Sequence, residues 1–315
     1  MAVDLLSTEV VAVIVAVAGG EGGAEPEPRV LTVGAPTGVP ALPSGPLLAG
    51  HRSLQAGLRD WVESQTGLRL GYVEQLYTFA DRERTGSHSR VISVSYLGLT
   101  RPEHLEPDGA TWRAWYDLLP WEDRRFAVPP GAHVAQAGLN AWARAAATGE
   151  LAEQRRLRAD RAFGDSGRAW HPEDCLKRYE LLWEAGLLAE SRTAPRPSDS
   201  PRPATGERML HDHRRIVATG LTRLRAKIQY RPVVFELLPD AFTLGQLQQV
   251  VEALSGTRLH KQNFRRLVET EELVEETGQT TSATGGRPAR LMRFRTDAFA
   301  ERSGAGLRLP QSRTR

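Results

Sequence analysis

The chain has 315 residues, which is long enough for two domains that each bury an apolar core. Its 41 lysine and arginine residues are balanced by 38 aspartate and glutamate residues, so the net charge of +3 does not by itself indicate a nucleic-acid-binding protein. The single cysteine, Cys175, excludes an internal disulfide and indicates a reducing compartment. We expect it to pack as a small buried apolar residue.

Two apolar runs, at residues 10–17 and 29–33, open the chain and predict a pair of strands joined by a glycine-rich connection. The first run is too short to cross a bilayer, which takes about 20 apolar residues. Acidic residues, Asp4 and Glu9, precede it in place of the basic segment of a secretion signal. We therefore expect no membrane association and a cytoplasmic location.

Residues 42–68 predict an amphipathic helix that ends at Gly67. This segment resembles a Nudix box, whose glutamates share one helical face and hold Mg²⁺ through oxygen ligands. When Gly67 is aligned with the last glycine of the box, the positions of its arginine and glutamates are taken by Arg52, Asp60, Trp61, Ser64 and Gln65. The resemblance therefore implies a degenerate box with no catalytic or metal-binding residues, no required cofactor and no hydrolase activity.

Residues 72–79 and 91–97 alternate apolar with polar side chains, as half-buried strands do. Strands, a helix and further strands follow one another in the order of a Nudix sandwich. On this interpretation we expect a nucleotide to bind in the pocket beside the emptied box. The alternative, an amphipathic helix with no relation to Nudix proteins, stays open.

The middle of the chain is helical in pattern and rich in tryptophan. We interpret residues 103–190 as a helical insertion, 191–206 as a mobile proline-rich loop, and 211–228 as the second helix of the sandwich. The predicted helical segments are 112–125, 132–163 and 171–188, the last with a buried stripe of Leu176, Tyr179, Leu182 and Trp183. A separate all-helical domain over 132–228 is the alternative.

Three adjacent residues, His211, Asp212 and His213, could suggest a metal site. Adjacent positions on a helix do not face one another, and no further ligand cluster matches them. We expect them to cap the start of the following helix, where a carboxylate is favourable.

The far end of the chain predicts helix, turn, helix and β-hairpin, the elements of a winged helix. Residues 242–256 open with a capping box, Thr243 and Gln246, and close at Gly256. In the second helix Phe264, Leu267 and Val268 form the predicted buried stripe. The exposed face holds Lys261, Gln262, Asn263, Arg265 and Arg266. These are the residue types that read bases and phosphates from a major groove, so we expect this helix to be the recognition helix.

The predicted hairpin has a tip at residues 279–286, and Arg287 and Arg290 begin its returning strand. We expect both arginines to contact DNA. Between Arg258 and Arg295 the acids are confined to five glutamates at 269–276, so the helix start and the wing are expected to be basic only. The alternative is an ordinary solvated face.

Together the two ends of the chain resemble the Nudix-related transcriptional regulators of the NrtR type. The resemblance is carried by residues 231–295 and, at the N-terminal end, by 70–82. It implies a repressor of NAD-metabolism genes whose effector is ADP-ribose or a related nucleotide.

We therefore predict an α+β protein: a Nudix-like α/β/α sandwich with a helical insertion (1–238), a small winged helix-turn-helix domain (239–300) and a disordered tail (301–315). The predicted function is a regulator that binds a double-stranded DNA operator as a homodimer and releases it in response to a nucleotide. One rival is a Nudix hydrolase of a nucleoside diphosphate derivative, with a relocated metal site built from Glu63, Glu74 and Asp81. Another is a nucleotide-binding scaffold with no operator.

Overall fold

The computed structural model describes residues 6–19, 25–80, 90–102, 109–191, 205–228, 233–282 and 288–295. The predictions for Arg287, for Asp81, for most of the proline-rich loop and for the tail lie outside these residues. Among the helices within these ranges, none is long and apolar enough to cross a bilayer.

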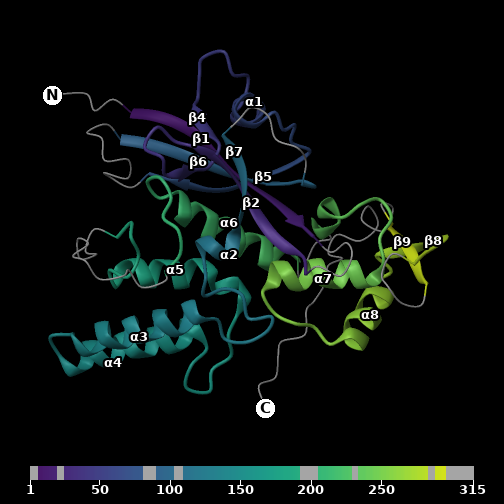
Figure 1. The fold of residues 1–315 in the computed structure, drawn as a ribbon. Helices are drawn as coiled ribbons and strands as arrows, with labels where there is room; N and C mark the ends of the chain where they lie inside the picture. Colours follow the sequence, from purple (N-terminus) through teal and green to yellow (C-terminus); the bar gives the residue numbers. More distant parts are fainter. Residues whose placement is uncertain are drawn as a thin grey trace.

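A mixed sheet forms the N-terminal part of the molecule (Figure 1). Its strands are β1 (Leu6–Ala18), β2 (Glu27–Gly34), β3 (Pro40–Ala41), β4 (Ser44–Pro46), β5 (Tyr72–Phe79), β6 (Arg90–Leu99) and β7 (Ala110–Ala114). The strand order is β3-β2-β1-β6-β5, with β4 paired to β1 and β7 paired to β2. The two N-terminal apolar runs pair antiparallel as predicted, and β1 also runs parallel to β6.

The two faces of β1 are both apolar because both are covered by a helix. Val10, Ala12 and Ile14 pack in one cluster with residues of α1 (Leu54–Thr66). The alternate side chains, Val11 and Val13 among them, pack in a second cluster with α6 (His213–Ile228). The sheet therefore lies between α1 and α6, which is the α/β/α sandwich that the sequence predicted (Figure 1).

The ends of α1 follow from its local sequence. The Ser53 hydroxyl accepts a hydrogen bond from the backbone N–H of Ala56 at 3.1 Å, which caps the first turn. Gly67 ends the helix with a φ of 71°, and its N–H donates to the carbonyl of Glu63. This left-handed conformation suits glycine, so the predicted end of the helix at Gly67 is confirmed.

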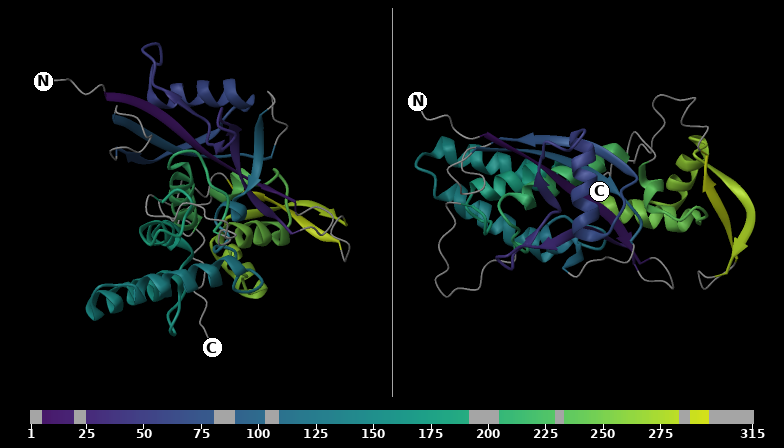
Figure 2. Two further views of the ribbon diagram at one scale, coloured as in Figure 1. Left: turned by 60° about the vertical axis from the view of Figure 1, so that its left-hand side comes forward. Right: turned by 90° about the horizontal axis from the view of Figure 1, so that it is seen from above.

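The helical middle segment comprises α2 (Trp115–Leu118), α3 (Pro130–Arg144), α4 (Gly149–Phe163), a short 3-10 helix (Pro172–Asp174) and α5 (Cys175–Glu184). α3 and α4 form a hairpin at one end of the molecule, far from the C-terminal β-hairpin, as Figures 1 and 2 both show. α5 packs along α6. Because α6 also covers the sheet, the residues of α5 join the same apolar core as those of the sheet.

The structure corrects the predicted helical pattern in three places. Ala110–Ala114 form a strand, because pairing with β2 outweighs a local pattern that also fits a helix. The stretch 132–163 is two helices, since α3 ends at Arg144 and α4 begins at Gly149. Trp183 is 41% exposed, whereas Arg178 and Leu181 are buried, because α5 turns its polar Arg178 inward to an ion pair.

The C-terminal elements are a 3-10 helix (Val233–Leu237), α7 (Leu244–Ser255), α8 (Lys261–Thr270), β8 (Val274–Thr281) and β9 (Ala289–Phe294). β8 and β9 pair antiparallel, and Phe242 bridges to Met292 by two backbone hydrogen bonds. Helix, turn, helix and wing are therefore present as predicted.

A buried carboxylate links three parts of the molecule. Glu122, which lies between α2 and α3, accepts hydrogen bonds from the Nε and Nη2 of Arg178 on α5 at 2.6 and 2.9 Å. It is also paired with Arg225 on α6, and all three side chains are fully buried. The Trp170 ring lies beside both guanidinium groups, 4.7 Å from that of Arg178 and 5.6 Å from that of Arg225.

The same cluster holds the winged helix. Arg225 Nε donates to the carbonyl of Leu254 at 2.9 Å, and the N–H of Arg124 donates to the carbonyl of Gly256 at 2.8 Å. The Tyr116 hydroxyl donates to the carbonyl of Ala253 at 2.6 Å. Burial raises the pKa of Tyr116 to about 12, so this hydroxyl keeps the proton that it donates. The last carbonyls of α7, which a helix leaves without partners, are thereby satisfied by the sandwich and the helical segment.

Removing the Glu122 charge should destabilise the fold. Burial alone would raise the pKa of Glu122, but the charges of Arg178 and Arg225 lower it below its ordinary value of 4.5. Glu122→Gln leaves two buried guanidinium groups without their carboxylate, and we expect a loss of roughly 3–5 kcal/mol in the free energy of unfolding, measured with urea at pH 7. The exposed pair of Glu180 and Arg215 supplies the control, since Glu180→Gln should change stability by less than about 1 kcal/mol.

The sign of the pH dependence follows from the lowered pKa. The stabilisation by Glu122 is complete at a pH above the pKa of this residue in the unfolded state. It is lost as the pH falls through the lower pKa that Glu122 has in the folded state. The difference in the free energy of unfolding between wild type and Glu122→Gln should therefore persist at pH 5 to 7 and decrease only at lower pH. A difference that disappeared already near pH 6 would contradict the lowered pKa of Glu122.

Candidate functional sites

One face of α8 carries the predicted recognition residues. Lys261, Gln262, Asn263, Arg265 and Arg266 are all exposed, while Phe264 and Val268 are buried against α7 and the wing. For these five exposed side chains the structure records no hydrogen bond or ion pair with the described residues. Three cations and two amides near the start of a helix therefore face solvent with their full hydrogen-bonding capacity, as a surface that contacts phosphates and base edges requires.

The turn before α8 is fixed by one buried carboxylate. Glu252, at the end of α7, accepts hydrogen bonds from the N–H of Leu259 at 2.9 Å and from the Gln248 amide at 2.8 Å. Arg258 donates to the same carboxylate at 2.7 Å. α7 itself begins with the predicted capping box, in which Thr243 and Gln246 bond each other's backbone, and ends at Gly256. The orientation of α8 on α7 is thus set by hydrogen bonds as well as by apolar packing.

The wing is less basic than its sequence predicted. Arg290 pairs with Glu276 across the hairpin, and Arg293 pairs with Glu275 at 2.6 Å. The prediction that the helix start and the wing are basic only is therefore wrong for the wing, because pairing of β8 with β9 places Arg293 opposite Glu275 and brings Glu276 within reach of Arg290. Arg290 is 73% exposed, so it can reach a phosphate only in competition with Glu276.

Two of the residues that the sequence aligned with the Nudix box, Trp61 and Gln65, hold the neighbouring strand. The Trp61 indole N–H donates to the carbonyl of Pro46 at 2.9 Å, and a Cβ atom built on Gly45 would overlap its ring. The Gln65 amide accepts from the N–H of Ser44 at 3.1 Å and donates to its carbonyl at 2.8 Å. Two side chains of α1 therefore hold β4, and the space beside this part of the box is filled by the indole ring.

The remaining positions of the box point away from a shared centre. Ser64 donates to the carbonyl of Trp61 within the helix, and Asp60 is exposed, 3.9 Å from His51. Arg52 is exposed as well. An indole, a hydroxyl and a primary amide that is already bonded through both its atoms do not supply the charged oxygen ligands that Mg²⁺ requires.

The acidic residues nearest to α1 do not converge either. Glu63 pairs with Arg69 at 2.8 Å beside α1. Glu74 lies on the face of the sheet that α6 covers, where it pairs with Arg223 at 2.9 Å and with Lys227. In the described parts of the chain, no three residues of histidine, cysteine, aspartate or glutamate form a group that could hold a metal ion.

The His-Asp-His segment starts α6, as predicted. The helix begins at His213, and the Asp212 carbonyl accepts the N–H of Ile216. The buried His213 ring accepts a hydrogen bond from the N–H of Leu42 at 2.9 Å, which ties α6 to the segment before α1. Cys175 is fully buried, as expected, and burial raises the pKa of its thiol well above the ordinary value.

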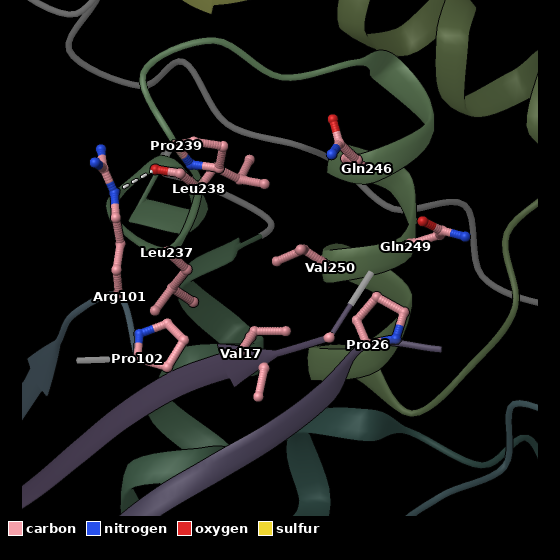
Figure 3. Close-up of a pocket in the computed structure, with 12 residues that line it drawn as sticks. Val17, Pro26, Arg101, Pro102, Leu237, Leu238, Pro239, Gln246, Gln249 and Val250 are labelled. Atoms are coloured by element: carbon pink, nitrogen blue, oxygen red, sulfur yellow. Dashed lines mark hydrogen bonds between the residues drawn. The ribbon is translucent and has the colours of Figure 1, made fainter. Parts of the chain in front are cut away.

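A pocket separates the sandwich from the winged helix (Figure 3). It has a volume of about 380 Å³, and its walls come from the end of β1, from the segment after β6 and from α7. Arg101 closes one side by donating to the carbonyl of Leu238 at 2.8 Å and to Asp240 at 2.6 Å. Most of the exposed lining is apolar, with Val17, Leu237 and Val250 as its floor. The winged helix is therefore attached to the rest of the molecule on more than one side of this pocket.

Residues 234–294 match the family model described as the NrtR DNA-binding winged helix domain. This part of the chain is an NrtR-type winged helix. The ADPR responsive transcriptional repressor NtrR of Acinetobacter baylyi is 40% identical to this chain over 86 residues. The match covers 27% of this chain and 34% of the relative, so the chain matches about a third of the length of that curated relative.

The fold of the whole chain is similar to two solved structures. Shewanella oneidensis NrtR, crystallised with a 27mer DNA, has a TM-score of 0.58 with 19% identity, over 96% of this chain and 99% of that one. A MutT/nudix family protein from Enterococcus faecalis has a TM-score of 0.55 with 15% identity, over 93% and 88%. The predicted fold, a Nudix-like sandwich joined to an NrtR-type winged helix, is confirmed.

The role of Trp61 can be tested through the glycine it covers. Gly45→Ala should cost roughly 1–3 kcal/mol of stability, because its methyl group displaces the indole ring and breaks the hydrogen bond to Pro46. Gly50→Ala in the same loop is the control, since no neighbouring atom lies within 4 Å of its Cβ position. Urea unfolding of both variants and of the Gly45→Ala/Trp61→Ala pair measures the effect. Equal stability of the two single variants would show that Trp61 does not hold the loop.

Proposed function

We propose that this protein is a transcriptional repressor that binds operator DNA through α8 and senses ADP-ribose or a related nucleotide through its Nudix-like domain. The observation that carries the proposal is the exposed face of α8, whose cations and amides face solvent on an NrtR-type winged helix. The curated relative is described as an ADPR responsive transcriptional repressor, and the similar Shewanella oneidensis protein was crystallised with DNA. Both facts support the same function here. Regulation of NAD metabolism is proposed as its setting because the resemblance to NrtR-type regulators implies it.

We further propose that the chain acts as a homodimer in the cytoplasm, with residues 1–238 as the effector domain and 239–300 as the DNA-binding domain. Paired half-sites give a dimer both affinity and a spacing that a change in the effector domain can disturb. Within α8, we assign Arg265 and Arg266 to base edges and phosphates in the major groove of the DNA. The other exposed residues of this helix face are assigned to the same groove: Lys261, Gln262 and Asn263. Arg287 and Arg290 are assigned to the DNA backbone beside the wing, where Arg290 would exchange Glu276 for a phosphate.

Removal of the α8 arginines tests DNA binding. Arg265→Ala and Arg266→Ala should each weaken operator binding, by about 1–3 kcal/mol where the arginine reads a base, with relaxed preference at one base pair. An arginine that contacts phosphate should instead weaken binding to all sequences alike. Fluorescence anisotropy with the upstream DNA of the gene, located first by footprinting, is the measurement.

The control for this series is Arg144→Ala, an exposed arginine at the end of α3. The α3–α4 hairpin projects from the opposite end of the molecule, so this variant should bind DNA as the wild type does (Figure 2). An unchanged affinity in the Arg265→Ala/Arg266→Ala double variant, with an intact circular dichroism spectrum, would exclude α8 as the recognition helix.

We also propose that the Nudix-like domain does not hydrolyse its nucleotide. The support is chemical: Trp61, Ser64 and Gln65 offer Mg²⁺ no carboxylate, and Trp61 and Gln65 are both bonded to β4. With ADP-ribose and Mg²⁺, product formation measured by chromatography should stay at the level of a protein-free control. Turnover that depends on Mg²⁺ and is abolished by Glu63→Gln would overturn this and favour the hydrolase alternative.

A further inference from the structure

A polar recess lies at the open edge of the sheet, between β5, α6 and the first turn of α1. Its volume of about 580 Å³ is within the range of sites for small molecules. Its polar lining consists of Gln55, Tyr72, Glu74, Gln75, Arg223 and Lys227. Unlike the space beside the degenerate box, which Trp61 fills, this recess is open and lined by side chains that can bond a ligand.

The charges of the recess favour an anion. Glu74 is the one carboxylate among its lining residues, against the two cations Arg223 and Lys227. Arg223 uses its Nε and Nη2 on Glu74, and its side chain is 58% exposed, while its Nη1 makes no hydrogen bond with the described residues. A guanidinium with a free edge is suited to bidentate contact with a phosphate.

The other lining groups suit the rest of a nucleotide. Gln55 and Gln75 are exposed, and the structure records no hydrogen bond of either amide with the described residues. Amides of this kind can pair with the donor and acceptor edge of a base. The Glu74 carboxylate can accept hydrogen bonds from the hydroxyls of a ribose. Phosphate, sugar and base groups each have a matching partner within one recess.

We infer that this recess is the effector site, and that it binds a nucleoside diphosphate derivative with its phosphates on Arg223 and Lys227. The inference rests on the proposed function and differs from the sequence prediction, which placed the nucleotide beside the emptied box.

The position of the recess on α6 also supplies a route to the winged helix. Residues of a helix turn by about 100° each, so Arg223 and Lys227 share one side while Arg225 lies on the opposite side. Arg225 is the residue that donates to Leu254 at the end of α7. A phosphate that draws Arg223 and Lys227 away from Glu74 changes the contacts that hold this end of α6 to β5. The same turns of α6 carry Arg225, which holds α7 of the DNA-binding domain. A ligand that shifts this part of α6 would therefore also shift the DNA-binding domain, which couples ligand binding to DNA binding.

The test measures ADP-ribose binding to the full-length protein by calorimetry, without DNA and with the operator bound. Arg223→Gln should weaken ADP-ribose binding at least 10-fold and leave DNA affinity without nucleotide unchanged. Arg215→Gln is the matched control, because Arg215 lies on the same helix but pairs with Glu180 on α5. In the wild type, DNA should weaken ADP-ribose binding by the same factor as ADP-ribose weakens DNA binding, typically about 5- to 150-fold.

A second variant separates loss of the site from loss of a fold. Gln55→Glu places a carboxylate in the first turn of α1, where the helix dipole favours it, so the fold should be kept while phosphate is repelled. It too should weaken ADP-ribose binding. If the wild type binds no ADP-ribose, the proposed sensor function fails. If the wild type binds it and both variants bind it equally well, the sensor stands and the recess is not its site.

Discussion

The buried carboxylate of Glu122 is the interaction on which the arrangement of this molecule depends. It pairs with two buried arginines that come from different helices, and each arginine also donates hydrogen bonds to carbonyl groups. Taking three charges out of water is costly, and a well-packed apolar cluster of the same size could be as stable. The charged cluster also fixes the orientation of α7 relative to α6. Hydrogen bonds are directional, whereas apolar contacts alone would allow several orientations.

This attachment has a consequence for signalling. An NrtR-type winged helix joined only by a flexible linker would move independently of the sandwich. Here the carbonyls of Ala253, Leu254 and Gly256 are bonded by Tyr116, Arg225 and Arg124, and Arg101 bonds the connection before α7. Coupling between two sites requires a physical element whose state both sites influence. α6 meets that requirement, since it contacts the sheet, α5 and α7 along its length.

α1 has an intact structural framework although its sequence offers few carboxylates. α1 still has its cap, its terminal glycine and its buried Leu58 and Val62, so the sandwich keeps its second layer. Two of its side chains, Trp61 and Gln65, bond the strand β4 that precedes the helix. Packing constrains the buried face of this helix, whereas its exposed face is not constrained in this way.

The sequence by itself determined the elements whose signals are local. Capping residues and terminal glycines located α1 and α7, a continuous apolar run located β1, and alternation located β5 and β6. The polar face of α8 was evident from helical spacing. Other features could be seen only in the tertiary structure, because they depend on which residues distant in sequence come into contact. Pairing with β2 made Ala110–Ala114 a strand, and pairing across the wing placed Arg290 against Glu276. The recess at β5 joins Gln55, Glu74 and Arg223, which are up to 168 residues apart in sequence, and no local pattern carries that information.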